Sequence, residues 1–194
     1  MKSLIITLLC SFCLSTTNAQ SYFRQCGIQL LTKQNGLSNN TLTGIYQDKV
    51  GFLWLGTDVG LSRYDGIHFH NYNLIDKEPR ALAHLYETSN NLLWSHIANL
   101  NQIACFDKMR GIYMPLISPT PEVLKDIQDI CVLQDKLYAL TSNVIVELKM
   151  EKNADEIRLT AQPLIDIKTK VLRLYNNEDI LCALTVENQI LLYP

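Results

Sequence analysis

Residues 48–66, DKVGFLWLGTDVGLSRYDG, hold four glycines and three aspartates around the apolar core FLWLG. Glycine and aspartate disfavour helices and favour turns, so the stretch predicts a turn about every six to eight residues. Its dipeptide Asp65-Gly66 is typical of a type I′ hairpin. Short apolar runs alternate with the turns, at 42–47, 52–57, 61–64 and 67–72. The pattern predicts a β-meander of four antiparallel strands in about 31 residues.

A single meander is marginal by itself, so copies of it are expected along the chain. Leu53-Trp54 recurs 40 residues later as Leu93-Trp94, and LYALT at 137–141 recurs 44 residues later as LCALT at 181–185. Short strands repeated at this period are typical of β-propeller blades. The sequence therefore predicts an all-β fold for residues 20–194, an incomplete β-propeller of about four 4-stranded antiparallel blades. The units are expected at about 36–75, 76–118, 119–162 and 163–194.

One large side chain recurs in the second strand of these units. Trp54, Trp94 and Tyr138 occupy the position in the first three units, and the smaller Cys182 occupies it in the fourth. A buried aromatic side chain removes about 150–250 Å² of surface from water. We therefore expect these residues to fill the space between adjacent blades.

The N-terminal residues are typical of a secretory signal peptide. Lys2 supplies a positive charge, residues 4–14 form a short apolar run, and Thr17 and Ala19 place small side chains at a cleavage site. We predict that residues 1–19 are removed and that the mature chain is periplasmic. No second apolar run of about 18 residues follows, so no membrane span is expected in this chain.

The charge balance bears on the class of partner. The 194 residues include 17 Lys and Arg and 19 Asp and Glu, which gives a formal net charge of −2. Proteins that bind nucleic acid usually show a basic excess or a basic patch. Nucleic acid is therefore not an expected partner.

Residues 35–72, NGLSNNTLTGIYQDKVGFLWLGTDVGLSRYDGIHFHNY, resemble the two-component regulator propeller repeat. The matching elements are Gly36-Leu37-Ser38, Gln47-Asp48, Gly51, Leu53-Trp54, Gly56-Thr57, Gly60-Leu61, Arg63-Tyr64-Asp65-Gly66 and Phe69. The second unit keeps Leu93-Trp94 but replaces Gly-Thr by Ser95-His96. The third and fourth units keep only the apolar framework.

The resemblance implies a function as well as a fold. Proteins with this repeat are typically periplasmic sensors of hybrid two-component systems in gut Bacteroidetes, which detect oligosaccharides and control polysaccharide-utilisation genes. Such a sensor is implied to contain two rings of about seven blades, a β-sandwich module, a membrane helix, a histidine kinase and a receiver. Because the chain ends at Pro194, in or just after the fourth unit, we expect an N-terminal piece of a longer sensor that is not itself an enzyme. The expected partners are an oligosaccharide, bound through the full-length parent, and a second copy of that parent.

Two other functional classes are left open. A fragment of a β-propeller lyase or glycosidase would bring carboxylates from several blades together at the central channel. A structural or adhesion module is the weaker alternative. Turnover of a glycan would distinguish an enzyme from a sensor.

The histidines and aspartates fit structural roles. His68 and His70 share one face of a strand, but two ligands are too few for a metal site. The other histidines, His84 and His96, lie in a different blade. The aspartates of the first unit, at 48, 58 and 65, occupy turns where an aspartate binds its own backbone. The sequence predicts no catalytic residue, metal site or cofactor.

Four cysteines remain after the predicted leader. They are Cys26, Cys105, Cys131 and Cys182, and their spacings include no CxxC pair that would indicate zinc or a redox motif. Disulfides are permitted in an exported chain. The apolar surroundings of the last three favour buried free thiols over disulfides.

Overall fold

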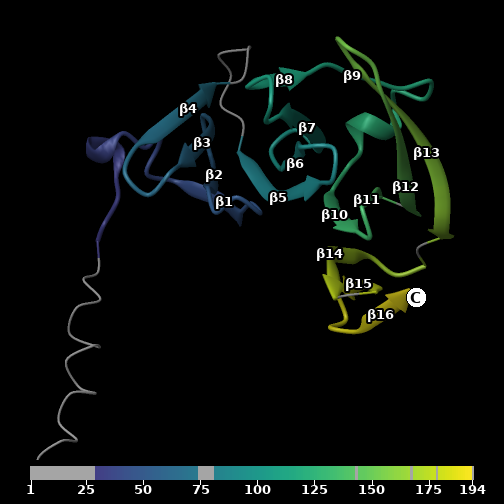
Figure 1. The fold of residues 1–194 in the computed structure, drawn as a ribbon. Coiled ribbons are helices and arrows are strands. Elements are labelled where there is room, and N and C mark those ends of the chain that lie inside the picture. The colour runs from purple at the N-terminus through teal and green to yellow at the C-terminus, as the bar shows by residue number, and fades with distance from the viewer. Residues whose placement is uncertain (1–28, 74–80, 143, 167, 178, 194) are drawn as a thin grey trace, which may run out of the picture. The chain divides into compact units, whose positions relative to one another are not determined.

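The computed structural model describes residues 29–73, 81–142, 144–166, 168–177 and 179–193 (Figure 1). The predicted signal peptide and Cys26 lie outside the described residues. The chain divides into two compact units, 1–31 and 32–194, and nearly all described residues belong to the second. Apart from strands, the described residues form two short 3-10 helices, η2 (Lys33–Asn35) and η3 (Val123–Lys125). In these ranges there is no helix with the length and apolar character needed to span a membrane.

The strands form four sheets in chain order, which confirms the predicted all-β fold. The first sheet contains β1 (Leu42–Gln47), β2 (Leu53–Thr57), β3 (Gly60–Tyr64) and β4 (Phe69–Asn73). The second contains β5 (Leu82–Thr88), β6 (Leu92–Ile97), β7 (Gln102–Asp107) and β8 (Ile112–Met114). The third contains β10 (Asp129–Leu133), β11 (Lys136–Leu140), β12 (Val144–Lys152) and β13 (Ile157–Asp166), and the fourth β14 (Val171–Asn177), β15 (Ile180–Thr185) and β16 (Ile190–Tyr193). Consecutive strands within each sheet pair antiparallel.

The third and fourth sheets differ from the predicted four strands. The third gains a fifth strand, β9 (Leu116–Ile117), which pairs parallel with the outer edge of β13. Pro115 precedes β9, and its carbonyl accepts the N–H of Ile157 at 2.9 Å. Proline has no N–H to donate to a ladder, so β8 ends there and the chain can leave the second sheet. The fourth sheet has three strands within the described residues.

The sheets pack through their first strands and through the apolar surfaces between them. The first strands contact one another in order, β1 with β5, β5 with β10 and β10 with β14, which is how neighbouring propeller blades meet. Trp54 is 1% exposed and lies in a cluster with Leu82 and Phe106 of the second sheet. Trp94 lies in a cluster with the third sheet, and Tyr138 lies in one with the fourth.

Gly56 marks the closest approach of the first two sheets. A Cβ atom at this position would lie 1.9 Å from the carbonyl oxygen of Leu82, so no larger residue fits without moving the backbone. In the second sheet His96 lies opposite Ala83 just as Gly56 lies opposite Gly44. His96 therefore replaces the glycine, and the predicted alignment of Gly-Thr with Ser95-His96 is wrong by one residue.

The turn at Asp65-Gly66 is also not the predicted type I′ hairpin. A type I′ turn needs positive φ at both central residues, here Asp65 and Gly66, but only Gly66 has it, at φ 99°. The Asp65 carboxylate instead accepts the N–H groups of Ile67 and His68 at 2.8 and 2.7 Å. This side-chain cap stabilises a wider loop between Tyr64 and Phe69.

Candidate functional site

A recess with a volume of about 540 Å³ is bordered by the first strands of three sheets. Its lining includes Gly44 on β1, His84 and Tyr86 on β5, and Arg173 on β14. A second recess of similar size lies between β7, β8 and η3, with mostly apolar walls. Functional sites usually combine a concave surface with a few convergent polar groups, and the first recess has this combination.

Four residues occupy one register on the first strands. Tyr46, Tyr86, Cys131 and Tyr175 lie opposite the recurring second-strand residues 54, 94, 138 and 182. Two residues before each of them stand Gly44, His84, Asp129 and Arg173, respectively. The blade repeat therefore brings three polar side chains, one from each of three successive sheets, toward the same end of their strands.

His84 lies in a β-bulge with an unusual backbone conformation. The pairing of β5 with β6 shifts register between Ala83 and Tyr86, and His84 has φ 52°. Left-handed conformations are uncommon for residues other than glycine, although histidine is one of those that tolerate them. In a bulge of this kind the left-handed position usually belongs to glycine.

The imidazole of His84 connects an exposed cation to a buried anion. Its Nε2 atom lies 3.2 Å from Nη1 of Arg173, and its Nδ1 atom lies 3.6 Å from Oδ1 of Asp129. A guanidinium can only donate, so Nε2 accepts and the ring proton is on Nδ1, facing the carboxylate. The contact to Arg173 therefore fixes the tautomer and orientation of the ring.

Asp129 is 2% exposed and joins the third sheet to the fourth. Its Oδ2 atom accepts the N–H of Leu174 at 2.8 Å, and its Oδ1 atom accepts the N–H of Ile130 at 2.9 Å. These two donors and the nearby imidazole of His84 compensate the buried charge. Asp129 is thus held in place by backbone donors and positions the ring of His84, which lies closer to the exposed Arg173.

His96 lies behind His84, with 6.3 Å between the two ring centroids. Its Nε2 atom is 2.9 Å from the carbonyl oxygen of Ile127, which can only accept, so Nε2 carries a proton. Burial lowers the pKa of His96 below its usual value, and this outweighs the opposing effects of the Ile127 carbonyl and of Asp129. A neutral His96 therefore ties the second sheet to the start of the third.

The thiols near these strands are unsuited to nucleophilic chemistry. Cys105 and Cys131 are free and buried, and Cys182 is free and half-buried. Burial raises the pKa of the Cys131 thiol to about 12 and raises that of Cys105 as well. Because the thiolate is the reactive form, both groups are inert near neutral pH.

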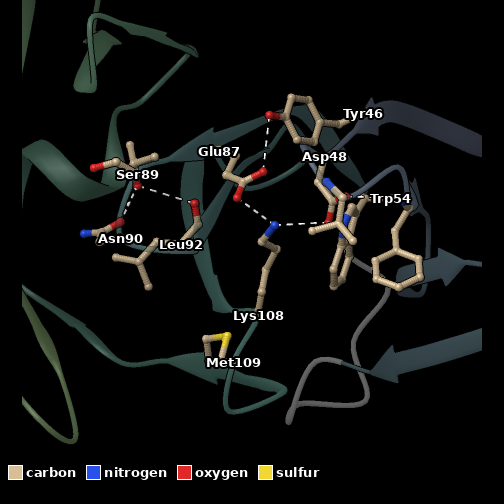
Figure 2. A network of polar contacts seen from close by, with 12 residues as sticks. Tyr46, Asp48, Trp54, Glu87, Ser89, Asn90, Leu92, Lys108 and Met109 are labelled. Carbon is tan, nitrogen blue, oxygen red and sulfur yellow. Dashed lines mark hydrogen bonds and ion pairs between the residues drawn. The ribbon is translucent and has the colours of Figure 1, made fainter.

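A separate polar network joins the first sheet to the second (Figure 2). The ammonium of Lys108 lies 2.6 Å from Oε1 of Glu87 and 3.1 Å from Oδ2 of Asp48. The hydroxyl of Tyr46 donates to the other oxygen of Glu87 at 3.4 Å. All three charged side chains are nearly buried, with 10% or less of each exposed. The network is a clamp between the two sheets, and none of its three charged side chains is among the recess-lining residues.

Asp48 organises the first turn as well as the clamp. Its Oδ1 atom accepts three backbone N–H groups, at 50, 51 and 52, each at 3.0 Å. Its Oδ2 atom accepts the indole N–H of Trp54 at 2.9 Å and an N–H of Lys108. Burial alone would raise the pKa of Asp48, but the hydrogen bonds from Trp54 and Lys108 lower it below its usual value. The carboxylate is therefore ionised at neutral pH.

The other motif residues of the first unit lie in its turns and at its sheet edges. The hydroxyl of Ser38 lies 2.7 Å from that of Ser62 and 3.0 Å from that of Thr57, which fastens the segment with Gly36 and the buried Leu37 to the sheet. Gly51 and Gly60 have positive φ. The neighbours of Gly60, Leu61 and Thr57, are buried. None of these residues lines the recess of His84.

His68 and His70 lie apart from the recess as well. Their side chains are 75% and 52% exposed, at 4.0 and 3.9 Å from Oδ2 of Asp65. Among the described residues, no group of three or more His, Cys, Asp or Glu is placed to hold a metal ion. At the second predicted turn, the hydroxyl of Thr57, rather than the carboxylate of Asp58, accepts the N–H of Val59.

Sequence reasoning placed His84 in the second blade but did not connect it with Asp129 and Arg173. The spacing of these three residues along the chain could have indicated that they lie together. Asp129 follows His84 by 45 residues and Arg173 follows Asp129 by 44, which is close to the blade period. Polar residues repeated at the period of a propeller lie at equivalent positions of successive blades.

Residues 36–59 match the family model described as two component regulator propeller. A comparison with curated proteins found no match. Among solved structures, the chain is similar to the extracellular domain of the hybrid two component system BT3049 from B. thetaiotaomicron. The identity is 21% and the TM-score 0.60, over 84% of this chain and 24% of that one.

Two further structures extend the comparison. The extracellular domain of the one component system BT4673 from B. thetaiotaomicron is 17% identical with a TM-score of 0.60, over 86% of this chain and 23% of that one. Virginiamycin B lyase from Staphylococcus aureus is 18% identical with a TM-score of 0.54, over 81% of this chain and 57% of that one. The chain thus spans about a quarter of the length of the two B. thetaiotaomicron domains. The chain carries the two-component regulator propeller repeat and folds as blades of a β-propeller.

Proposed function

We propose that this chain is part of the extracytoplasmic, ligand-sensing propeller of a hybrid two-component regulator. The observation that carries the proposal is the convergence of His84, Asp129 and Arg173, each from a different sheet, beside a recess of about 540 Å³. Sites for small ligands typically have volumes of about 300–1,000 Å³ and a small number of placed polar groups. The repeat at residues 36–59 supports the assignment to a regulator.

An oligosaccharide is the ligand class that we propose. Sugar hydroxyls donate and accept hydrogen bonds, and Arg173 offers donors at the recess. Ala83, Leu85 and Ala98 add apolar surface to the same lining, against which the C–H faces of a sugar ring can pack. A ligand held by side chains from more than one sheet would bias how the blades pack, which is a route by which binding could be transmitted.

The remaining parts of the proposal concern the parent protein. We propose that it lies in the periplasm, that a histidine kinase in the parent receives the signal, and that polysaccharide-utilisation genes respond. The expected N-terminal leader supports export, and the resemblance of the first unit supports the regulatory role.

Isothermal titration calorimetry of the whole chain against a panel of oligosaccharides tests the proposal. The variant Ala98→Trp narrows the recess at an exposed lining position, and Ala154→Trp is the matched control at an exposed loop elsewhere. We expect saturable binding that Ala98→Trp weakens and Ala154→Trp leaves unchanged. Equal binding by both variants would contradict the location of the site.

Chromatography of the same mixtures tests the alternative of an enzyme. A sensor returns its oligosaccharide intact, whereas a lyase or glycosidase releases shorter products. Product formation by the chain would refute the sensor proposal and favour a carbohydrate-active propeller.

A further inference from the structure

We infer that the recess selects oligosaccharides that carry a carboxylate, as in uronic acids, and that Arg173 is the residue that recognises this group. The inference rests on the proposed function, because it names the class of sugar that the proposed site would take. It rests on the positive charge of Arg173 and on the contact of its guanidinium with His84, whose ring lies next to Asp129.

Arg173 is an exposed cation at the recess with no carboxylate partner among the described residues. Its one polar contact in that part of the chain is from Nη1 to Nε2 of His84, at 3.2 Å. A guanidinium has five N–H donors in a planar fork, so most of them stay available. A fork of this geometry binds a carboxylate through two parallel hydrogen bonds.

Asp129, the acid of this cluster, forms no ion pair with Arg173. Asp129 accepts the N–H groups of Ile130 and Leu174 and faces Nδ1 of His84, on the far side of the ring from the guanidinium. The imidazole therefore separates the buried anion from the exposed cation. His96 is the other titratable neighbour of His84, and burial keeps it neutral. The group that the recess presents to a ligand is thus a cation.

The backbone of His84 shows that its side chain is held in place at a conformational cost. The residue has φ 52° in a bulge, where glycine would be unstrained. Non-glycine residues in sparsely populated conformations cluster at ligand sites, and the observed outlier is consistent with such a role. At His84 the bulge lets Nε2 orient the guanidinium of Arg173. His84 is a positioning residue in this account, and Arg173 is the binding residue.

A pair of ligands that differ only in charge provides the test. Trigalacturonate carries three carboxylates, and its methyl ester has the same sugar skeleton with those charges removed. Calorimetric titration of the whole chain with both compounds gives the preference for the acid. Because hydrogen bonds to charged groups are stronger than those to neutral groups, we expect the acid to bind at least about tenfold more tightly than the ester.

Two variants that each remove one positive charge test whether Arg173 is the source of the preference for the acid. Arg173→Gln removes the proposed binding group, and Arg158→Gln removes an equivalent charge from an exposed position on β13. We expect Arg173→Gln to lose about tenfold or more in affinity for the acid and little for the ester, and Arg158→Gln to bind as the unsubstituted chain does. His84→Gln, which loses the rigid ring between Asp129 and Arg173, is expected to reduce the acid preference partially. Circular dichroism of each variant verifies that the fold is retained.

The outcomes separate this inference from the proposed function. Equal affinity for acid and ester, or equal effects of the two arginine substitutions, overturns the inference. If neutral oligosaccharides bind under those conditions, the sensor proposal stands without it. If neither acidic nor neutral oligosaccharides bind, both proposals fail.

Discussion

Substituting Lys108 by methionine is expected to weaken the packing of the first sheet against the second. The ammonium lies 2.6 Å from Glu87 and 3.1 Å from Asp48, and the side chains of Lys108, Glu87 and Asp48 are 10%, 8% and 2% exposed (Figure 2). Methionine keeps the length of the side chain but leaves two buried carboxylates without their cation. Breaking a buried ion pair in this way costs about 3–5 kcal/mol of the free energy of unfolding. The indole of Trp54 and the backbone donors still bind Asp48, so we expect the lower end of this range at pH 7.

The destabilisation has a defined pH dependence. The pKa of Asp48 is lowered in the folded chain, so its contribution is present above the unfolded pKa and is lost as pH falls through the folded pKa. In Lys108→Met the penalty at Asp48 exists only while its carboxylate is ionised. The difference in stability between variant and parent is therefore expected to be full at pH 7 and to shrink below about pH 4.

Urea unfolding followed by tryptophan fluorescence measures this difference. Lys149→Met, at an exposed position on β12, is the matched control and is expected to change the free energy of unfolding by less than about 0.5 kcal/mol. If Lys108→Met and Lys149→Met were equally stable at pH 7, the clamp would contribute nothing measurable. A difference in the free energy of unfolding that grew as the pH fell would contradict the expected loss of the Asp48 contribution at low pH.

Three further predictions address the blades, the thiols and export. Trp54→Ala is expected to lower the free energy of unfolding by about 3–5 kcal/mol in urea titrations, because the cluster with Phe106 cannot close around the gap, whereas the exposed Lys49→Ala changes it little. Iodoacetamide at pH 8 is expected to leave Cys105 and Cys131 unmodified in the folded chain and to modify both in urea, as read by mass spectrometry; rapid labelling of the folded chain would contradict their burial. N-terminal sequencing of exported material is expected to begin at Gln20, and a form that retains Lys2 would exclude cleavage after Ala19.

The strands of the first unit could be predicted closely from the sequence because its turns are marked by glycine and aspartate. The predicted run 42–47 coincides with β1, and 52–57 differs from β2 by one residue. The type of turn at Asp65-Gly66 could not be predicted in the same way. A carboxylate that caps two N–H groups stabilises a wider loop than the dipeptide indicates, and this depends on the side chain's conformation.

Features that depend on tertiary contacts could not be predicted from the pattern of apolar and turn-forming residues. β9 is two residues long, and its pairing with β13 depends on where Pro115 releases the chain from the second sheet. The alignment at His96 was wrong by one residue although the 40-residue offset of the tryptophans already places Gly56 opposite His96, and the strand pairing confirms that offset. The candidate site depends on register in the same way. His84, Asp129 and Arg173 are far apart in sequence and meet only because their strands share one register.

The most direct test of the account is a map of backbone amide shifts in the NMR spectrum of the whole chain as trigalacturonate is added. The account predicts that the largest perturbations fall on β5 and β14 around His84 and Arg173, and that the methyl ester perturbs these amides far less at equal concentration. Perturbations centred on the other recess, at Met114 and Leu124, or none at any concentration tested, would contradict it.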